Sequence, residues 1–257
     1  LPRMAGDELI DAFDDGFSAF VFKIQANMNK AHRDRIAFMR VVSGRFDADR
    51  EVYHVQGGKK LRLSRPQQLM AAEREIIEEA YAGDIIGVFD PGIFSIGDTL
   101  CDPGHRFQFD PIPTFAPEHF RRVRPLDTMK RKQFLKGMEQ IAQEGAIQIF
   151  KTPYSGMEEV IVGVVGTLQF DVLEYRLKNE YGVDLYAEGL PYEYLRWMEH
   201  EGDEPLRAED LTLPGDAMLV EDYRQNQLLL FASQWSIRWT QERNEQISLS
   251  EFGGAKF

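Results

Sequence analysis

Apolar and polar side chains alternate along several short runs in the first half of the chain. Phe20, Phe22 and Ile24 alternate with Val21, Lys23 and Gln25. In residues 36–42, Ile36, Phe38, Arg40 and Val42 alternate with Ala37, Met39 and Val41, although most of these residues are apolar. A period of two is typical of a strand that buries one of its faces. The pattern therefore predicts strands over these two segments and groups Phe20, Phe22 and Ile24 on one face of the first.

Further strand-like runs follow between turn signals. They cover residues 51–55, 61–63 and 85–89, and Gly57-Gly58 and Asp90-Pro91-Gly92 mark turns between them. Proline fixes φ and glycine accepts positive φ, so both residue types favour tight turns. Many short strands with glycine turns and almost no helical pattern predict a closed or nearly closed β-barrel over residues 17–112.

The segments on either side of this barrel differ from it in composition. Residues 1–16 are acidic and carry few large apolar side chains, so we expect a linker there. After the barrel, Asp110-Pro111-Ile112-Pro113 stiffens the chain and is typical of a domain boundary. We therefore expect a linker over residues 1–16, a β-barrel domain over 17–112 and an α+β domain over 113–257.

The predicted second domain mixes helical and strand patterns. An apolar stripe within residues 134–142 predicts a helix, with Asp127 as its N-cap and Gly145 at its end. A second helix is expected to begin at Thr167, as N-cap, and to end near Tyr181. With the intervening strands, the order is strand–helix–strand–strand–helix–strand, which is that of a ferredoxin-like split β-α-β unit. An extension is expected beyond residue 190.

Charge and cysteine content narrow the classes of partner and compartment. The net charge is −12, so repulsion from phosphates argues against general affinity for nucleic acid and against DNA as a partner. The lone Cys101 cannot form an internal disulfide or a multi-cysteine zinc site, and a reducing cytoplasm is expected. The sequence contains no run of about 20 apolar residues, so no membrane span is expected.

Contact with RNA would have to use local basic runs. Four candidates stand out, although a charged run is more often simply a solvated surface. They are Lys30-Ala-His-Arg-Asp-Arg35, Lys59-Lys60-Leu-Arg62-Leu-Ser-Arg65, Arg121-Arg122-Val-Arg124 and Lys130-Arg-Lys132.

No motif in the sequence predicts an active site. A P-loop needs Gly-x-x-x-x-Gly-Lys followed by Ser or Thr, and this string is absent. Asp102-Pro-Gly-His105 is one residue short of the phosphate-sensing string of translational GTPases and is better interpreted as a turn. Cys101 could pair with His105, but without a third orienting group a structural thiol is favoured. We therefore predict no catalytic, cofactor-binding or metal-binding residue in these 257 residues.

Several long strings resemble translational GTPases. Those of the first half are Phe22-Lys-Ile-Gln-Ala-Asn-Met-Asn29, His32-Arg-Asp-Arg-Ile-Ala-Phe-Met-Arg-Val-Val-Ser-Gly44, Glu79-Ala-Tyr-Ala-Gly-Asp-Ile-Ile-Gly87 and Ile96-Gly-Asp-Thr-Leu100. Those of the second half are Ile112-Pro-Thr-Phe-Ala-Pro-Glu-His-Phe-Arg-Arg122, Glu144-Gly-Ala-Ile-Gln-Ile-Phe150 and Val164-Val-Gly-Thr-Leu-Gln-Phe-Asp-Val172. The first set is similar to the barrel domains of this class, including elongation factor G over residues 35–44. The second set resembles the class II release factors, the peptide chain release factor 3 family.

This resemblance implies a role in translation termination. It implies an amino-terminal G domain ahead of this chain, to which GTP or GDP, Mg²⁺ and GTP hydrolysis would belong, so this part would hold no cofactor and perform no catalysis. The two domains would dock on the ribosome, through rRNA and small-subunit proteins, and lean on the G domain. The family's task would be to recycle class I release factors through the ribosome.

Alternatives remain open at the level of sequence. The barrel half alone does not exclude a piece of an elongation-factor-like or ribosome-protection GTPase. A free-standing hydrolase would need a pocket with paired titratable groups, and the sequence shows no sign of one. From charge and expected loop position, the candidates for ribosome contact are Lys30, His32, Arg33, Lys59 and Lys60.

Overall fold

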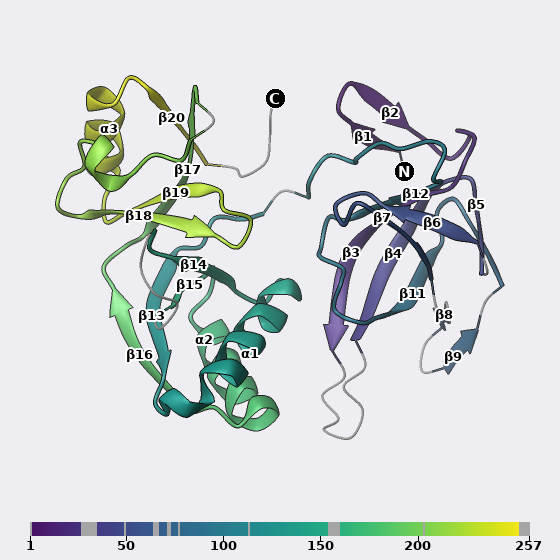
Figure 1. Ribbon diagram of the computed structural model, residues 1–257, viewed down its shortest axis with the longest axis horizontal. Helices are drawn as coiled ribbons and strands as arrows, with labels where there is room; N and C mark the ends of the chain where they lie inside the picture. Colours follow the sequence, from purple (N-terminus) through teal and green to yellow (C-terminus); the bar gives the residue numbers. More distant parts are fainter. Residues whose placement is uncertain are drawn as a thin grey trace. The chain divides into compact units, whose positions relative to one another are not determined.

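The computed structural model describes residues 2–26, 35–48, 50–63, 67–70, 73–76, 78–112, 114–153, 160–202 and 204–251. The chain divides into two compact units (Figure 1). The first comprises Leu1–Ile112 together with Gln143–Gly145, and the second comprises Pro113–Ala142 and Ala146–Phe257. Each unit is described below by itself.

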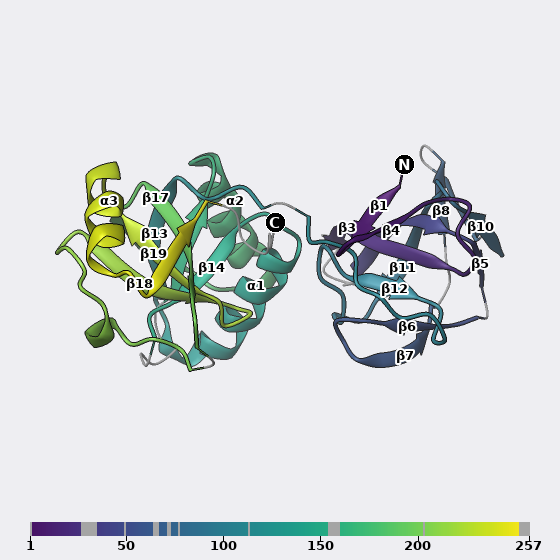
Figure 2. The same ribbon diagram turned by 90° about the horizontal axis from the view of Figure 1, so that it is seen from above.

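The first unit is a β-barrel-like domain, as the sequence predicts. Its main sheet has eight antiparallel strands in the order β7-β6-β12-β3-β4-β11-β8-β9, and it curls around an apolar interior (Figures 1 and 2). A two-stranded sheet of β5 and β10 accompanies it. The strands are β3 (Ser18–Ala26), β4 (Arg35–Ser43), β5 (Arg45–Asp47), β6 (Glu51–His54), β7 (Lys59–Arg62), β8 (Gln67–Met70), β9 (Glu73–Ile76), β10 (Glu79–Tyr81), β11 (Ile85–Asp90) and β12 (Thr99–Cys101).

The face of β3 that fills the barrel differs from the one that the alternation predicts. The pairing of β3 with β4 shifts register between Val21 and Lys23, as at a β-bulge. Because a bulge inserts one residue, the residues on its two sides change phase. Val21 and Ile24 consequently both lie in the barrel interior, whereas Phe20 is buried in a separate cluster on the outside. Grouping Phe20, Phe22 and Ile24 on one face is therefore wrong.

The linker predicted for residues 1–16 is also wrong. Residues of this segment form a hairpin of β1 (Arg3–Ala5) and β2 (Glu8–Ile10). Ile10 is 1% exposed and packs with the outer cluster that contains Phe20. The N–H of Gly6 donates to Asp110 Oδ1 over 2.9 Å, which ties the turn of the hairpin to the end of the unit. The acidic composition of residues 1–16 gave no indication of this hairpin, which packs on the outside of the barrel through Ile10.

The second unit contains the predicted ferredoxin-like split unit. β13 (His119–Pro125), α1 (Arg131–Gln143), β14 (Gln148–Lys151), β15 (Val160–Val164), α2 (Leu168–Arg176) and β16 (Leu185–Leu190) follow one another along the chain. Their strands lie in the order β16-β13-β15-β14, all antiparallel. Apolar residues of both helices pack on one face of this sheet around Val123, Phe134 and Leu173.

The extension beyond residue 190 continues the same sheet. Strands β18, β19, β17 and β20 add to β14 in that order, and α3 lies beside them (Figure 1). The elements are β17 (Tyr194–His200), η3 (Ala208–Asp210), β18 (Ala217–Asp222), β19 (Gln227–Phe231), α3 (Gln234–Arg243) and β20 (Ile247–Ser250). No element could be predicted from the sequence beyond residue 243, and β20 lies in that part of the chain. None of the helices within the described ranges is both long enough and apolar enough to cross a membrane.

The structure confirms one of the two predicted N-cap side chains, Asp127, and not the other, Thr167. Asp127 acts as predicted, since its Oδ1 accepts from the N–H of Met129 over 2.9 Å and begins the short helix η1 (Thr128–Lys130) that leads into α1. Thr167 stands at the N-cap position of α2 but makes no capping hydrogen bond with its side chain. Gln169 Oε1 instead accepts from the N–H groups of Val165 and Gly166, each over 3.0 Å.

Candidate docking surfaces

The hairpin of β6 and β7 carries two of the predicted contact residues, Lys59 and Lys60. Its strands pair in register, with Lys60 opposite Tyr53 and Arg62 opposite Glu51. Val52 points into the barrel and is fully buried, which turns its neighbours in β6 outward. Lys59 and Lys60 are exposed, and Lys60 Nζ lies 3.0 Å from Glu51 Oε1.

An arginine from a later loop joins this surface. Arg106 Cζ lies 4.0 Å from the centroid of the Tyr53 ring, so a guanidinium stacks on an aromatic side chain beside the hairpin. We call Tyr53, Lys60, Arg62 and Arg106 the β6–β7 face. Basic and aromatic side chains together suit the sugar–phosphate backbone and exposed bases of RNA. A second interpretation is structural, because lysine on a terminal strand of a sheet also prevents edge-to-edge aggregation.

Lys30, His32 and Arg33, the other three predicted contact residues, lie outside the described residues. Arg106 and Tyr53 were missed by the sequence reasoning. Neither lies in a basic run, and only the pairing of β6 with β12 brings the loop after Cys101 close to the hairpin.

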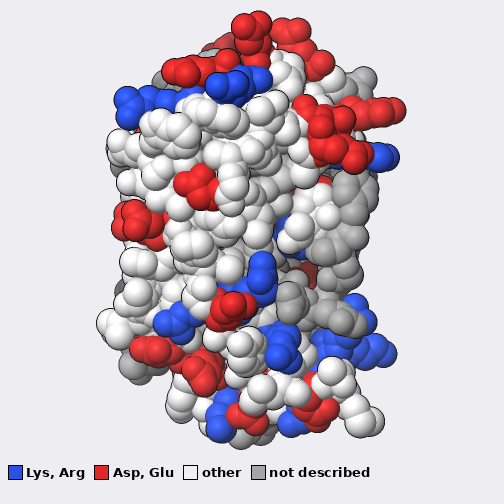
Figure 3. Space-filling view, turned by 90° about the vertical axis from the view of Figure 1, so that its left-hand side faces the viewer, with Lys and Arg blue, Asp and Glu red and all other residues white. Residues whose placement is uncertain are grey.

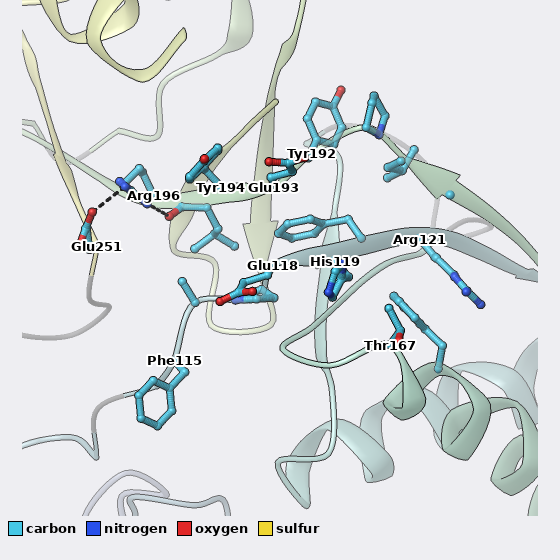
Figure 4. A pocket seen from close by; sticks show the side chains of 18 of the residues that line it. Phe115, Glu118, His119, Arg121, Thr167, Tyr192, Glu193, Tyr194, Arg196 and Glu251 are labelled. Atoms are coloured by element: carbon cyan, nitrogen blue, oxygen red, sulfur yellow. Dashed lines mark hydrogen bonds and ion pairs between the residues drawn. The ribbon is translucent and has the colours of Figure 1, made fainter. Parts of the chain in front are cut away.

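The second unit has an open groove of about 970 Å³ (Figure 4). It is lined by the start of β13, by the turn before α2 and by the loop between β16 and β17. Arg196 Nη2 lies 2.6 Å from Glu251 Oε1, so the charge of this arginine is compensated within the groove. Burial raises the pKa of the Tyr192 hydroxyl, which keeps this phenol protonated and able to donate a hydrogen bond. Aromatic, acidic and basic side chains thus share the lining.

The residues around Cys101 fit a structural role. Cys101 is fully buried, and burial raises the pKa of its thiol, which is the opposite of what a thiolate nucleophile needs. The N–H of His105 donates to the carbonyl of Asp102 over 3.0 Å, so Asp102-Pro-Gly-His105 is a turn, as predicted. Asp102 Oδ2 accepts from the N–H of Phe17 over 2.9 Å and lies 2.8 Å from Arg50 Nη2. Among the described residues, no group of three His, Cys, Asp or Glu side chains could hold a metal ion.

Two family models match successive parts of the chain. Residues 16–103 match the model of elongation factor G domain 2, and residues 109–241, more than half of the chain, match that of class II release factor RF3, C-terminal domain. The chain belongs to the class II release factor RF3 family. The second unit decides this assignment, since the barrel model alone points to elongation factor G.

Relatives within the family cover almost the whole chain. The peptide chain release factor 3 of Symbiobacterium thermophilum is 56% identical over 243 residues, which are 95% of this chain and 45% of the relative. That of Gloeobacter violaceus is 44% identical over 249 residues, which are 97% of this chain and 46% of the relative. The chain therefore spans about half the length of the curated relatives that it matches.

A solved structure from Thermus thermophilus has a similar fold. It matches with a TM-score of 0.55 and 18% sequence identity, over 81% of this chain and 31% of that protein. At this identity the likeness concerns the fold alone.

Proposed function

We propose that the two units are the ribosome-docking part of a translational GTPase that promotes recycling or dissociation of class I release factors. The observation that carries the proposal is the order of the family matches, in which elongation factor G domain 2 precedes the RF3 C-terminal domain. In this proposal, GTP binding and hydrolysis belong to a G domain outside these 257 residues. The partners are rRNA, small-subunit proteins, class I release factors acting through the ribosome, and that G domain.

A second candidate function follows from the first unit alone. Its match to elongation factor G domain 2 would also suit a part of an elongation-factor-like or ribosome-protection GTPase. A peptide-release recycling assay separates the two, using the full-length factor with and without residues 113–257. The full-length factor should accelerate the turnover of class I release factors on ribosomes, and removal of the second unit should abolish the acceleration. Acceleration that survives this deletion would contradict the proposal.

Nucleotide binding tests the location of the GTPase chemistry. The isolated 257-residue chain is expected to bind neither GTP nor GDP, because no P-loop occurs in its sequence. Titration with fluorescent GDP measures this directly, and the full-length relative from Symbiobacterium thermophilum is the positive control. Binding of GDP to the chain at micromolar concentration would overturn the proposal that nucleotide binding belongs to a G domain outside these residues.

Charge reversal on the β6–β7 hairpin tests the docking of the first unit. Lys59→Glu combined with Lys60→Glu should weaken binding of the full-length factor to ribosomes by about tenfold at moderate salt and lower the slope of log K against log salt by about 2, if each lysine neutralises one phosphate. Sedimentation with ribosomes across a KCl series provides both values.

The matched control for this double variant is Lys23→Glu with Arg45→Glu, which reverses two exposed cations elsewhere on the same unit. Its affinity should stay close to that of the unmodified factor. Equal losses for both double variants would show a general effect of charge, and an unchanged affinity of the Lys59/Lys60 variant would remove these residues from the interface.

A further inference from the structure

One short segment of the second unit is strongly basic in an otherwise acidic protein. Residues 121–136 contain seven Lys or Arg residues and one Asp, although the chain as a whole has a net charge of −12. These residues are Arg121, Arg122, Arg124, Lys130, Arg131, Lys132 and Lys136, with Asp127 as the acid. Such a concentration of one charge marks a candidate for contact with a polyanion.

The fold brings the middle of this segment against a second stretch of chain. The N–H of Leu126 donates to the carbonyl of Asp184 over 2.9 Å, and Lys130 Nζ donates to the carbonyl of Gly182 over 2.5 Å. Lys178 Nζ, from the helical segment η2 (Leu177–Tyr181), lies 3.0 Å from Asp184 Oδ1. The end of β13, η1, the start of α1 and the end of η2 therefore form one surface.

We call the cationic side chains of this surface the basic end. They are Arg124, Lys130, Arg131, Lys132 and Lys178. On the face of the protein shown in Figure 3, Lys and Arg are more frequent toward the lower end, where Asp and Glu are interspersed with them, than toward the upper end. Asp127 and Asp184 belong to the same surface, and Asp184 pairs with Lys178, so the cations outnumber the acids there without excluding them.

Two of these cations are exposed near the start of α1. Arg131 and Lys132 are exposed in the first turn of α1, a turn that contains no acidic residue. The helical segment begins one turn earlier, at η1, where Asp127 is the N-cap, so the helix dipole has little effect at Arg131 and Lys132. Lys136 adds a like charge four residues after Lys132. Within the described part of the chain, neither Arg131 nor Lys132 has an ion-pair partner. Because like charges at this spacing cost helix stability, the Lys132–Lys136 pair is expected to serve function.

Arg124 gives the basic end a defined geometry. Its Cζ lies 4.4 Å from the centroid of the Tyr186 ring, which is opposite it on β16. Stacking on an aromatic ring holds a guanidinium flat and leaves the N–H groups at its edge for phosphate oxygens. Leu126 and Met129, 59% and 89% exposed, lie between the cations and can contact sugar or base edges.

We propose that the basic end of the second unit docks on the phosphate backbone of an RNA helix. That this RNA belongs to the ribosome rests on the function proposed above. The partner needs a regular array of phosphates, because the fixed Arg124–Tyr186 stack and the cations at the start of α1 are held by rigid elements. An anionic membrane is a different occupant, and binding to lipid vesicles distinguishes it from RNA.

The test uses the purified chain with Arg131→Glu and Lys132→Glu together. Both positions are exposed, and a carboxylate at position 132 would stand four residues before Lys136 in a favourable order, so this variant should be about as stable as the unmodified chain. The control is Arg224→Glu with Arg238→Glu, which applies the same charge change to exposed positions elsewhere on the unit. The probes are protein-free 16S rRNA, 70S ribosomes, and vesicles of phosphatidylcholine with phosphatidylserine.

The Arg131/Lys132 variant should bind 16S rRNA about tenfold more weakly than the unmodified chain, with a salt slope lower by about 2, and the control should stay within about twofold. Equal affinity of both variants for the rRNA, or no rRNA binding by the unmodified chain, would overturn the inference. So would a loss confined to vesicles, which would assign the basic end to a membrane. If the variant lost rRNA binding but the unmodified chain did not bind ribosomes, the inference would stand and the proposed function would be rejected. If the variant kept both its ribosome binding and its rRNA binding in full, the inference would be rejected and the proposed function would stand.

Discussion

Replacement of Asp90 by asparagine is expected to lower the free energy of unfolding of the first unit by about 3–5 kcal/mol. Asp90 Oδ2 lies 3.2 Å from Arg35 Nη2, and the two side chains are 0% and 6% exposed. Asp90 Oδ1 also accepts from the N–H groups of Gly92 and Ile93, each over 2.8 Å. Asparagine can keep the second set of bonds but removes the negative charge, which leaves a buried guanidinium facing a neutral amide.

Urea unfolding can measure this loss within the first unit. All three tryptophans, Trp197, Trp235 and Trp239, belong to the second unit, so their fluorescence supplies an internal reference while far-UV circular dichroism follows the whole chain. Asp47→Asn is the matched control, because Asp47 pairs with Arg45 over 3.0 Å on an exposed surface, and such a pair contributes less than about 1 kcal/mol. Similar unfolding midpoints for the two variants would contradict the assignment of a critical buried pair.

Gly44→Ala is expected to cost about 3 kcal/mol or more, from backbone strain combined with overpacking. Gly44 has φ of +63°, which disfavours any side chain. A Cβ at this position would also come within 3 Å of the backbone of Gly16 and 2.8 Å from the backbone N of Phe17. Because these are main-chain atoms, no side-chain rotation can relieve the clash.

Gly58→Ala separates the two causes. Gly58 has nearly the same φ, +62°, but a Cβ there would meet no atom within 4 Å. This variant therefore carries the backbone strain alone, of about 1 kcal/mol. Thermal unfolding by calorimetry should show a much lower transition temperature for Gly44→Ala than for Gly58→Ala. Equal shifts would mean that the close approach to Gly16 and Phe17 contributes nothing.

The topology of the second unit could be predicted because its signals are local. Asp127 begins the first helical segment, an apolar stripe defines α1, and the order of elements matches a known split unit. The phase change at the bulge of β3 could not be predicted, because it depends on pairing with β4. Similarly, Thr167 has the residue type of a cap, yet Gln169 satisfies the free N–H groups, which only tertiary geometry reveals.

The two candidate docking surfaces were likewise predictable only in part from the sequence. Lys59 and Lys60 are visible in the sequence as a basic run, and so are the separate runs at 121–124 and 130–132. Their meeting with Lys178 requires the contact between the end of β13 and the Gly182–Leu185 segment, which lies about fifty residues further along the chain. Charged runs can thus be recognised in the sequence, whereas which of them lie close together in space depends on the fold.

The burial of Cys101 simplifies the labelling of this protein. A thiol that is fully buried and resists deprotonation reacts slowly with maleimides at neutral pH. A cysteine introduced on the surface would react first, so a fluorophore can be attached at a chosen position without removal of the native thiol. One dye near the β6–β7 hairpin and another near the start of α1 would then report separately on how each unit approaches its partner.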